Sequence, residues 1–265
     1  MNAEMDIWDL HTHLSGVPGR TPPERLGQLI RFADRMGVRR LCVFMGLDWS
    51  YDPSPAKMRQ ENDEVLEAIR TFPERALGFV YLNPKHPAAS LDELDRCVRD
   101  GPMVGVKLWV AEHCNAKELD PLIHRATALG VPIFQHTWLK ITGNLPGEST
   151  PMELAELAAR HPQAQFICGH SGGDWEVGLR AIRLHPNIFT DLGGGDPVAG
   201  FTEMAVRELG VDRVLYGSDI GGRSFASQLG KVYGAQLSQR DQAQILGGNL
   251  RRLLEPVLRR KGMRP

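Results

Sequence analysis

Short apolar runs alternate with longer amphipathic stretches along the whole chain. The apolar runs have the length and composition of buried strands. They cover residues 7–10, 40–45, 77–82, 104–110, 132–136, 165–169, 188–192 and 214–218. Stretches with helical periodicity lie between them, for example at 22–36, 91–99, 117–129, 152–160 and 201–209. Eight alternating strand and helix units predict a parallel sheet that closes into a single-domain (β/α)₈ TIM barrel, here spanning residues 1–265.

Residues that favour helix ends support this division. Capping residues at helix starts are predicted at Thr21, Ser90, Thr150 and Asp196. Glycines stand just before predicted strands, where left-handed C-caps are expected, at Gly37, Gly130 and Gly210. Several of the connections that follow strands are long, namely 47–55, 138–149 and 220–238. Because the loops after the strands of such a barrel surround one face, these lengths predict a partly covered pocket there.

Composition narrows the class of partner. The chain has 42% hydrophobic and 24% charged residues and a net charge of −1, so it has no basic surface to attract nucleic acid or an acidic membrane. We therefore expect a small-molecule partner and leave homo-oligomer formation open. Cys42, Cys97, Cys114 and Cys168 form no paired motif, and no run has the length of a membrane span. These features predict a cytoplasmic protein with free thiols.

The first strand ends in the sequence Asp9-Leu10-His11-Thr12-His13. Side chains two apart on a strand point the same way, so His11 and His13 are expected to emerge on one face. Two imidazoles placed in this way can bind one divalent metal ion. Asp9 lies deeper on the same face, where we expect it to support the histidines or the barrel packing.

Three more donors stand at the ends of later strands: His136, His170 and Asp219. Strand ends meet at one face of a barrel, so all five side chains should surround its mouth. Three histidines and a carboxylate suit Zn²⁺, and Mn²⁺ or Fe²⁺ are compatible with the same donors. Such an ion would activate water near neutral pH, and Asp219 could accept the water's proton.

These motifs resemble the amidohydrolase superfamily, and more closely its amidohydrolase-2 type of TIM-barrel metal-dependent hydrolases and decarboxylases. The resemblance also includes Gly105-Val106-Lys107-Leu108, Gly169-His170-Ser171-Gly172, Gly217-Ser218-Asp219 and the segment from Ile245 to Leu250. It implies that His11, His13, His136 and Asp219 hold the catalytic metal. It further implies that His170 either polarises the substrate or binds a second metal.

Lys107 separates a one-metal site from a two-metal site. A carboxylated Lys107 would bridge two ions, the second of them also bound by His170, whereas an unmodified amine would hold a substrate carboxylate. A third interpretation is a lysine that extends to solvent and has no role in the site. The amidohydrolase-2 resemblance favours a single ion. The chain reads Lys107-Leu108-Trp109-Val110 where the family often has histidine and proline, so Trp109 is expected to form a wall of the pocket. Further substrate contacts are predicted at His113, Trp138 and Arg223. Gly193, Gly194 and Gly195 are expected to leave room beside the metal.

Three functions follow from these residues. The first is a metal-dependent hydrolase of a small amide, lactone or ester, in which a metal-activated water attacks, Asp219 transfers the proton and His170 stabilises the oxyanion. The alternative is metal-dependent, non-oxidative decarboxylation of an aromatic or unsaturated carboxylic acid on the same ligands. The third is a barrel that binds a metal or ligand without catalysis, against which the open coordination position argues.

Overall fold

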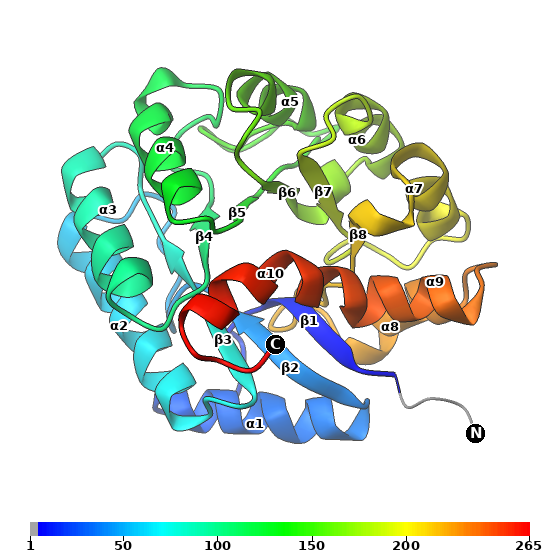
Figure 1. The fold of residues 1–265 in the computed structure, drawn as a ribbon, viewed down its shortest axis with the longest axis horizontal. Helices are drawn as coiled ribbons and strands as arrows, with labels where there is room; N and C mark the ends of the chain where they lie inside the picture. The colour runs from blue at the N-terminus through cyan, green and yellow to red at the C-terminus, as the bar shows by residue number, and fades with distance from the viewer. Residues whose placement is uncertain (1–4) are drawn as a thin grey trace.

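The protein is a barrel of eight parallel strands that follow one another in sequence order (Figure 1). The computed structural model describes residues 5–265, so the first four residues of the predicted domain 1–265 lie outside the described part. The strands are β1 (Ile7–Thr12), β2 (Val38–Val43), β3 (Ala76–Tyr81), β4 (Gly105–Leu108), β5 (Ile133–Gln135), β6 (Phe166–Cys168), β7 (Ile188–Asp191) and β8 (Val214–Leu215).

Backbone hydrogen bonds close the barrel between the last strand and the first. The Leu10 amide donates to the Tyr216 carbonyl at 3.1 Å, and the Asp219 amide donates to the His11 carbonyl at 2.8 Å. The second bond places Asp219 directly beside β1. The predicted (β/α)₈ fold is therefore confirmed, while the domain limits remain a prediction.

Helices surround the strands on the outside (Figure 1). They are α1 (Pro22–Arg35), α2 (Pro55–Thr71), α3 (Pro87–Leu94), α4 (Asp120–Ala128), α5 (Pro151–Arg160), α6 (Trp175–Ile182), α7 (Phe201–Leu209), α8 (Phe225–Tyr233), α9 (Gln239–Ala243) and α10 (Asn249–Arg260). Short π or 3₁₀ turns are η1 (Asp95–Arg99), η2 (Lys117–Leu119), η3 (Gly169–Gly172), η4 (Val211–Arg213) and η5 (Gln244–Gly248). Within residues 5–265, no helix combines the length and the apolar character that a membrane crossing requires.

Two of the four predicted helix starts are confirmed. The hydroxyls of Thr21 and Thr150 accept from the backbone amides of Glu24 and Glu153, and Thr150 forms a complete capping box. Ser90 is not a cap, because α3 already begins at Pro87 and the Ser90 hydroxyl bonds to the backbone of Asn83 instead. Asp196 is not a cap either, since α7 begins later and Gly200 in a left-handed conformation occupies its N-cap. Predicted C-cap glycines Gly37, Gly130 and Gly210 do have positive φ angles.

The last five strands, β4 to β8, are shorter than the apolar runs that predict them. The run 214–218 forms only two ladder residues in β8, because the Tyr216 amide turns to the Ile245 carbonyl and the Ser218 amide turns to the Asp9 carboxylate. The run 132–136 yields β5 from Ile133, since Pro132 has no amide to donate. His136 and His170 thus lie just past their strands, on the loops of the C-terminal face.

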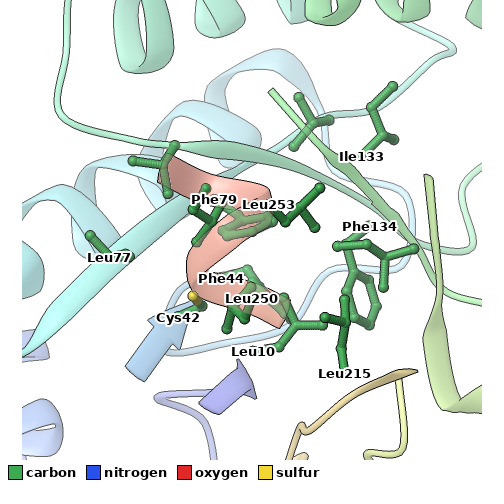
Figure 2. Close-up of a cluster of buried hydrophobic side chains, with 14 of the residues drawn as sticks. Leu10, Cys42, Phe44, Leu77, Phe79, Ile133, Phe134, Leu215, Leu250 and Leu253 are labelled. Carbon is green, nitrogen blue, oxygen red and sulfur yellow. The ribbon is translucent and has the colours of Figure 1, made fainter. Parts of the chain in front are cut away.

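Apolar side chains pack on the barrel strands in one buried cluster. Phe44, Phe79 and Phe134 are buried and in ring contact, and Leu10 and Leu215 lie beside them (Figure 2). Helix α10 crosses the N-terminal end of the barrel and contributes Leu250 and Leu253 to the same cluster. Each fully buried leucine or phenylalanine contributes about 1.5–3 kcal/mol of burial free energy. The closed end makes a rigid floor beneath the opposite, C-terminal face.

Candidate metal centre

Three of the predicted metal ligands converge in the structure. The Nε2 atoms of His11 and His13 lie 3.0 Å apart, and each lies 3.4 Å from Oδ1 of Asp219. Donor atoms that sit about 2.0–2.2 Å from one ion are themselves roughly 3.0–3.5 Å apart. The spacing of these three donors therefore fits a single divalent ion, and the alternation of β1 is what turns both imidazoles to the same side.

The other nitrogen of His11 and that of His13 each face a group that can only accept a hydrogen bond. Nδ1 of His11 lies 2.7 Å from Oδ2 of Asp191, and Nδ1 of His13 lies 3.3 Å from the Phe44 carbonyl. A carbonyl or an ionised carboxylate requires that the nitrogen facing it carries the proton. Because both Nδ1 atoms are donors, each Nε2 is left to face the centre of the cluster.

His136 and His170 form a second pair beside the first. Nδ1 of His136 lies 3.1 Å from Nε2 of His170. Their remaining nitrogens also face acceptors, since His136 Nε2 lies 2.9 Å from the Glu148 carboxylate and His170 Nδ1 lies 3.0 Å from the Gly193 carbonyl. Hydrogen bonds to His136 and Lys140 overcome the opposing effect of burial and lower the pKa of Glu148 to about 2, so it is ionised.

The protonation states of the histidines leave unprotonated ring nitrogens facing one another. Burial lowers the pKa of His13 and of His136 to about 4, and lowers that of His170 well below its usual range. These three imidazoles are therefore neutral at pH 7, and the facing nitrogens of His136 and His170 both lack a proton. Such contacts are repulsive unless a cation lies at them. This donor set fits a divalent metal ion better than it fits a packed core.

Among residues 5–265, four residues other than glycine hold left-handed backbone conformations, and all four lie at strand ends on this face. They are Met45, His170, Ser171 and Asp219, with φ between 49° and 62°. This region costs about 1–2 kcal/mol for a residue with a side chain. The cost is offset by specific bonds: the Asp219 amide donates to the His11 carbonyl, and the Ser171 hydroxyl bonds to Thr190 and to the Asp191 carbonyl. Strain concentrated in this way marks a functional site.

A cavity of about 160 Å³ opens beside the donors. Its lining comprises His11, His13, Met45, Trp49, Lys107, Trp109, His136, Trp138, His170, Asp219 and Arg223. Trp138 stacks on His136 with ring centroids 6.0 Å apart, and Trp49 lies edge-on to His13 at 4.8 Å. An apolar cavity of about 150 Å³ accommodates benzene. The space therefore suits one aromatic ring.

Lys107 projects from β4 into the base of this cavity. Its Nζ lies 4.0 Å from the ring centre of Phe134 and 4.8 Å from that of Phe44, and it forms no ion pair within residues 5–265. Burial lowers the pKa of Lys107 to about 7, so the charged and neutral amines are both populated near neutral pH. The charged form can hold an anion, and the neutral form is the one that could be carboxylated.

Most predicted substrate contacts line the cavity, but one does not. Lys107, Trp109, Trp138 and Arg223 are all in its lining. His113 instead pairs with Glu153 at 2.9 Å and lines a neighbouring cavity, so its predicted role stays untested.

Three residues of the site were not singled out from the sequence. Asp191 and Glu148 orient His11 and His136, and Trp49 forms one wall. Asp191 ends an apolar strand, as the predicted ligands do, and this was the available signal. Glu148 lies 12 residues beyond His136 in a long loop, where no sequence motif indicates a role in the site.

Comparisons with known proteins identify the family to which this chain belongs. The amidohydrolase family model matches residues 8–255. The decarboxylase orsB of Emericella nidulans is 30% identical over 182 residues, covering 64% of this chain and 52% of that protein. The 2,6-dihydroxybenzoate decarboxylase from Rhizobium superposes with a TM-score of 0.77 at 18% identity, covering 95% of this chain and 99% of the other.

A dihydroxybenzoic acid decarboxylase from Polaromonas sp. JS666, with bound manganese and the inhibitor 2-nitroresorcinol, superposes with a TM-score of 0.74 at 18% identity. It covers 94% of this chain and 97% of its own. At such identities the superpositions demonstrate a shared fold. The chain spans about half the length of the curated relatives that it matches. Because the family model runs from the first strand into the last helix, the protein belongs to the amidohydrolase family.

Proposed function

We propose that this protein is a metal-dependent decarboxylase of an aromatic carboxylic acid, in the size range of a hydroxylated benzoate. The observation that carries the proposal is the cavity: it has the volume of one ring, tryptophans form its walls, cations lie in its lining, and facing imidazole lone pairs lie at its base. The decarboxylase names of the relatives support this alternative over the hydrolase that the motifs first favoured.

His11, His13 and Asp219 are the proposed principal ligands, with His136 adjoining them. A divalent ion bound there would supply a Lewis acid that holds and polarises the oxygens of the substrate. The nitrogen and carboxylate donors suit Zn²⁺ or Mn²⁺, and the manganese in one structural relative favours testing Mn²⁺ first. We retain one ion as the expected content. A second ion would use His170 and a carboxylated Lys107.

The remaining cavity residues would bind and orient the ring. Trp138 and Trp109 present ring faces and edges to a planar substrate, and the ammonium of Lys107 and the guanidinium of Arg223 attract its carboxylate. Phe44 and Phe134 beneath Lys107 exclude water from the base of the cavity. A flat aromatic acid with one negative charge fits the tryptophan walls, the two cations and the apolar base of the cavity.

Decarboxylation breaks the bond between the ring and the carboxylate carbon and leaves its electron pair on the ring. A proton must then form the new C–H bond, so that carboxylate and proton give CO₂ and the arene. We assign this proton transfer to Asp219 assisted by His170. Although burial opposes it, the neighbouring histidines lower the pKa of Asp219 below its usual range, so its carboxylate is ionised. In this proposal Asp219 takes a proton from a ring hydroxyl of the substrate and delivers it to the ring carbon that loses CO₂, and a proton from solvent then restores the hydroxyl.

The test is a product assay on protein loaded with Mn²⁺ or Zn²⁺. Hydroxybenzoates, including 2,6-dihydroxybenzoate, are incubated beside a panel of small esters, lactones and amides, and CO₂ and arene are measured against hydrolysis products. Loss of activity in Asp219→Asn, with activity kept in the exposed control Asp212→Asn, is the expected result. Turnover confined to the ester, lactone and amide panel would restore the hydrolase hypothesis. A wild type inert to every substrate, yet holding its metal, would favour the non-catalytic barrel.

Elemental analysis of the purified protein counts the ions. One equivalent per chain supports the single site, and two would support a carboxylated Lys107. If no metal is present and none binds on reconstitution, the proposed function is wrong.

A further inference from the structure

The loop that follows β7 lies directly against His170. The Gly193 carbonyl accepts the hydrogen bond from His170 Nδ1 at 3.0 Å. Gly194 has a φ of +75°, and a Cβ added to it would collide with Nδ1 of His170 and lie 3.2 Å from Oδ2 of Asp219. The backbone can approach the imidazole this closely only because the residue is glycine. The orientation of His170 therefore depends on where this loop lies.

Lys231 holds that loop from the outer side. Its Nζ, on the buried face of α8, donates to the Leu192 carbonyl at 2.7 Å and also to the Gly194 carbonyl. These two carbonyls flank Gly193. The lysine is itself fixed, since the Thr202 hydroxyl donates to its carbonyl at 2.7 Å and its ammonium lies 5.3 Å from the Phe201 ring centre. One side chain thus connects α8 to both sides of the residue that accepts from His170.

The loop is held from the inner side by Asp191. Its carboxylate accepts from the Gly193 amide at 2.8 Å and from the His170 amide at 3.3 Å. Within residues 5–265, Lys231 forms no ion pair, so its buried charge is met by backbone carbonyls and the Phe201 ring rather than by a carboxylate. Burial lowers the pKa of Lys231 to about 8, which leaves the ammonium protonated at neutral pH. Burying a cation without a carboxylate partner is costly, so its retention calls for a role.

We propose that Lys231 is a positioning residue of the catalytic site. By holding residues 192–194, it presents the Gly193 carbonyl to His170, which fixes the ring and keeps the proton on Nδ1. His170 Nε2 is thereby left as a lone pair toward His136 and the cavity. Part of the proposal rests on the proposed function, because it predicts an effect on turnover. The tautomer of His170 is independent of any substrate.

The experiment compares Lys231→Met with the wild type and with Lys261→Met. Lys261 is a matched control because it also donates to two backbone carbonyls, those of Val98 and Gly101, but at the N-terminal end of the barrel. Proton–nitrogen NMR of the histidine rings, on metal-free and zinc-loaded protein, reports the tautomer. The His170 signals are assigned by their absence in His170→Gln.

In the wild type and in Lys261→Met we expect the His170 proton on Nδ1 alone. In Lys231→Met we expect mixed tautomers and a kcat on hydroxybenzoates reduced about 10–100-fold with KM nearly unchanged, because the ring-binding walls are intact. Lys231→Gln keeps a hydrogen-bond donor, so its His170 tautomer and its kcat should both lie between those of Lys231→Met and those of the wild type. It also serves as the test if Lys231→Met does not fold.

A folded Lys231→Met that keeps the wild-type tautomer would overturn the proposal and leave Lys231 as an anchor of the fold. If Lys231→Met does not fold, a Lys231→Gln whose tautomer and kcat match the wild type in full, rather than in part, would overturn it. If instead the tautomer shifts while the wild type decarboxylates nothing, the positioning role stands and the proposed function fails.

Discussion

Asp191 and His11 are 180 residues apart in the chain, and Oδ2 of the first lies 2.7 Å from Nδ1 of the second. Both side chains are buried at the C-terminal end of the barrel. Although burial opposes it, the electrostatic interaction and hydrogen bond with His11 lower the pKa of Asp191, which keeps the carboxylate ionised. A carboxylate bonded to the outer nitrogen of a histidine fixes its tautomer and raises its basicity toward a metal.

Asp191→Asn should therefore weaken metal binding roughly 10–100-fold, the usual effect of removing such a partner. The amide keeps the shape of the carboxylate but carries no charge. Competition with a metallochromic chelator measures the change, and Asp212→Asn, an exposed carboxylate, is the control. Equal affinity in the two variants would show that Asp191 does not tune His11.

Metal retention should depend on pH in a direction set by the buried histidines. Because the pKa values of His13 and His136 are about 4, protons compete with the ion only well below the usual imidazole range. We expect the metal to remain bound through dialysis at pH 6 and to be lost as the pH falls from 5 toward 4. Elemental analysis of each dialysed sample measures this. Loss with a midpoint above pH 6.5 would mean that these histidines titrate like exposed ones.

Gly194 and Gly195 form a matched pair for testing the contact with His170. Both have positive φ, at +75° and +60°, so an alanine at either incurs a similar backbone cost of about 1–2 kcal/mol. Only at position 194 would the new Cβ meet His170, because the space around position 195 is open. Gly194→Ala should bind metal more weakly and lose most of its activity, whereas Gly195→Ala should lose stability alone. Denaturant unfolding measures the stability of both variants, and metal titration measures their affinity for the ion. Equal metal affinity in Gly194→Ala and Gly195→Ala would show that the contact with His170 does not matter.

Glu148 connects the loop over the cavity to His136. Its carboxylate accepts from His136, from Lys140 at 2.6 Å and from the Leu145 amide at 2.9 Å. Glu148→Ala should make this loop more mobile, so that amide exchange over residues 138–149 becomes faster. It should also allow both tautomers of His136, which would weaken metal binding. Hydrogen exchange followed by mass spectrometry measures the first effect. Glu156→Ala, an exposed carboxylate on α5, is the control, and unchanged exchange in Glu148→Ala would remove Glu148 from this role.

Glu61 gives a prediction about stability rather than activity. Its side chain is buried in α2, neither carboxyl oxygen forms a hydrogen bond within residues 5–265, and burial raises its pKa to about 7. A raised carboxyl pKa means that stability is present below the unfolded value near 4.5 and is lost as the pH rises through 7. Glu61→Met should therefore exceed the wild type in stability by up to roughly 3 kcal/mol at pH 8, and by much less at pH 5.

Urea unfolding at both pH values measures this difference, with the exposed Glu67→Gln as control. If the difference in free energy of unfolding between Glu61→Met and the wild type does not grow with pH, the Glu61 carboxyl is ionised in the folded protein without cost.

Local patterns were enough to predict the barrel and the histidines of its first strand. Strand and helix periods depend on neighbours a few residues apart, and the alternation of β1 places His11 and His13 on one side whatever the rest of the chain does. Capping by Thr21 and Thr150 is equally local. Ser90 misled because a proline three residues earlier had already started the helix.

The partners that make those histidines a site came only from the tertiary structure. Asp191, Glu148 and Lys231 act across separations of 180, 12 and at least 37 residues, through hydrogen bonds that form only in the folded chain. Local patterns in the chain were enough to place the metal-donor types at the strand ends. Folding decided which nitrogen of each histidine carries the proton, and therefore that the lone pairs face one another, because that choice is made by acceptors from other parts of the chain.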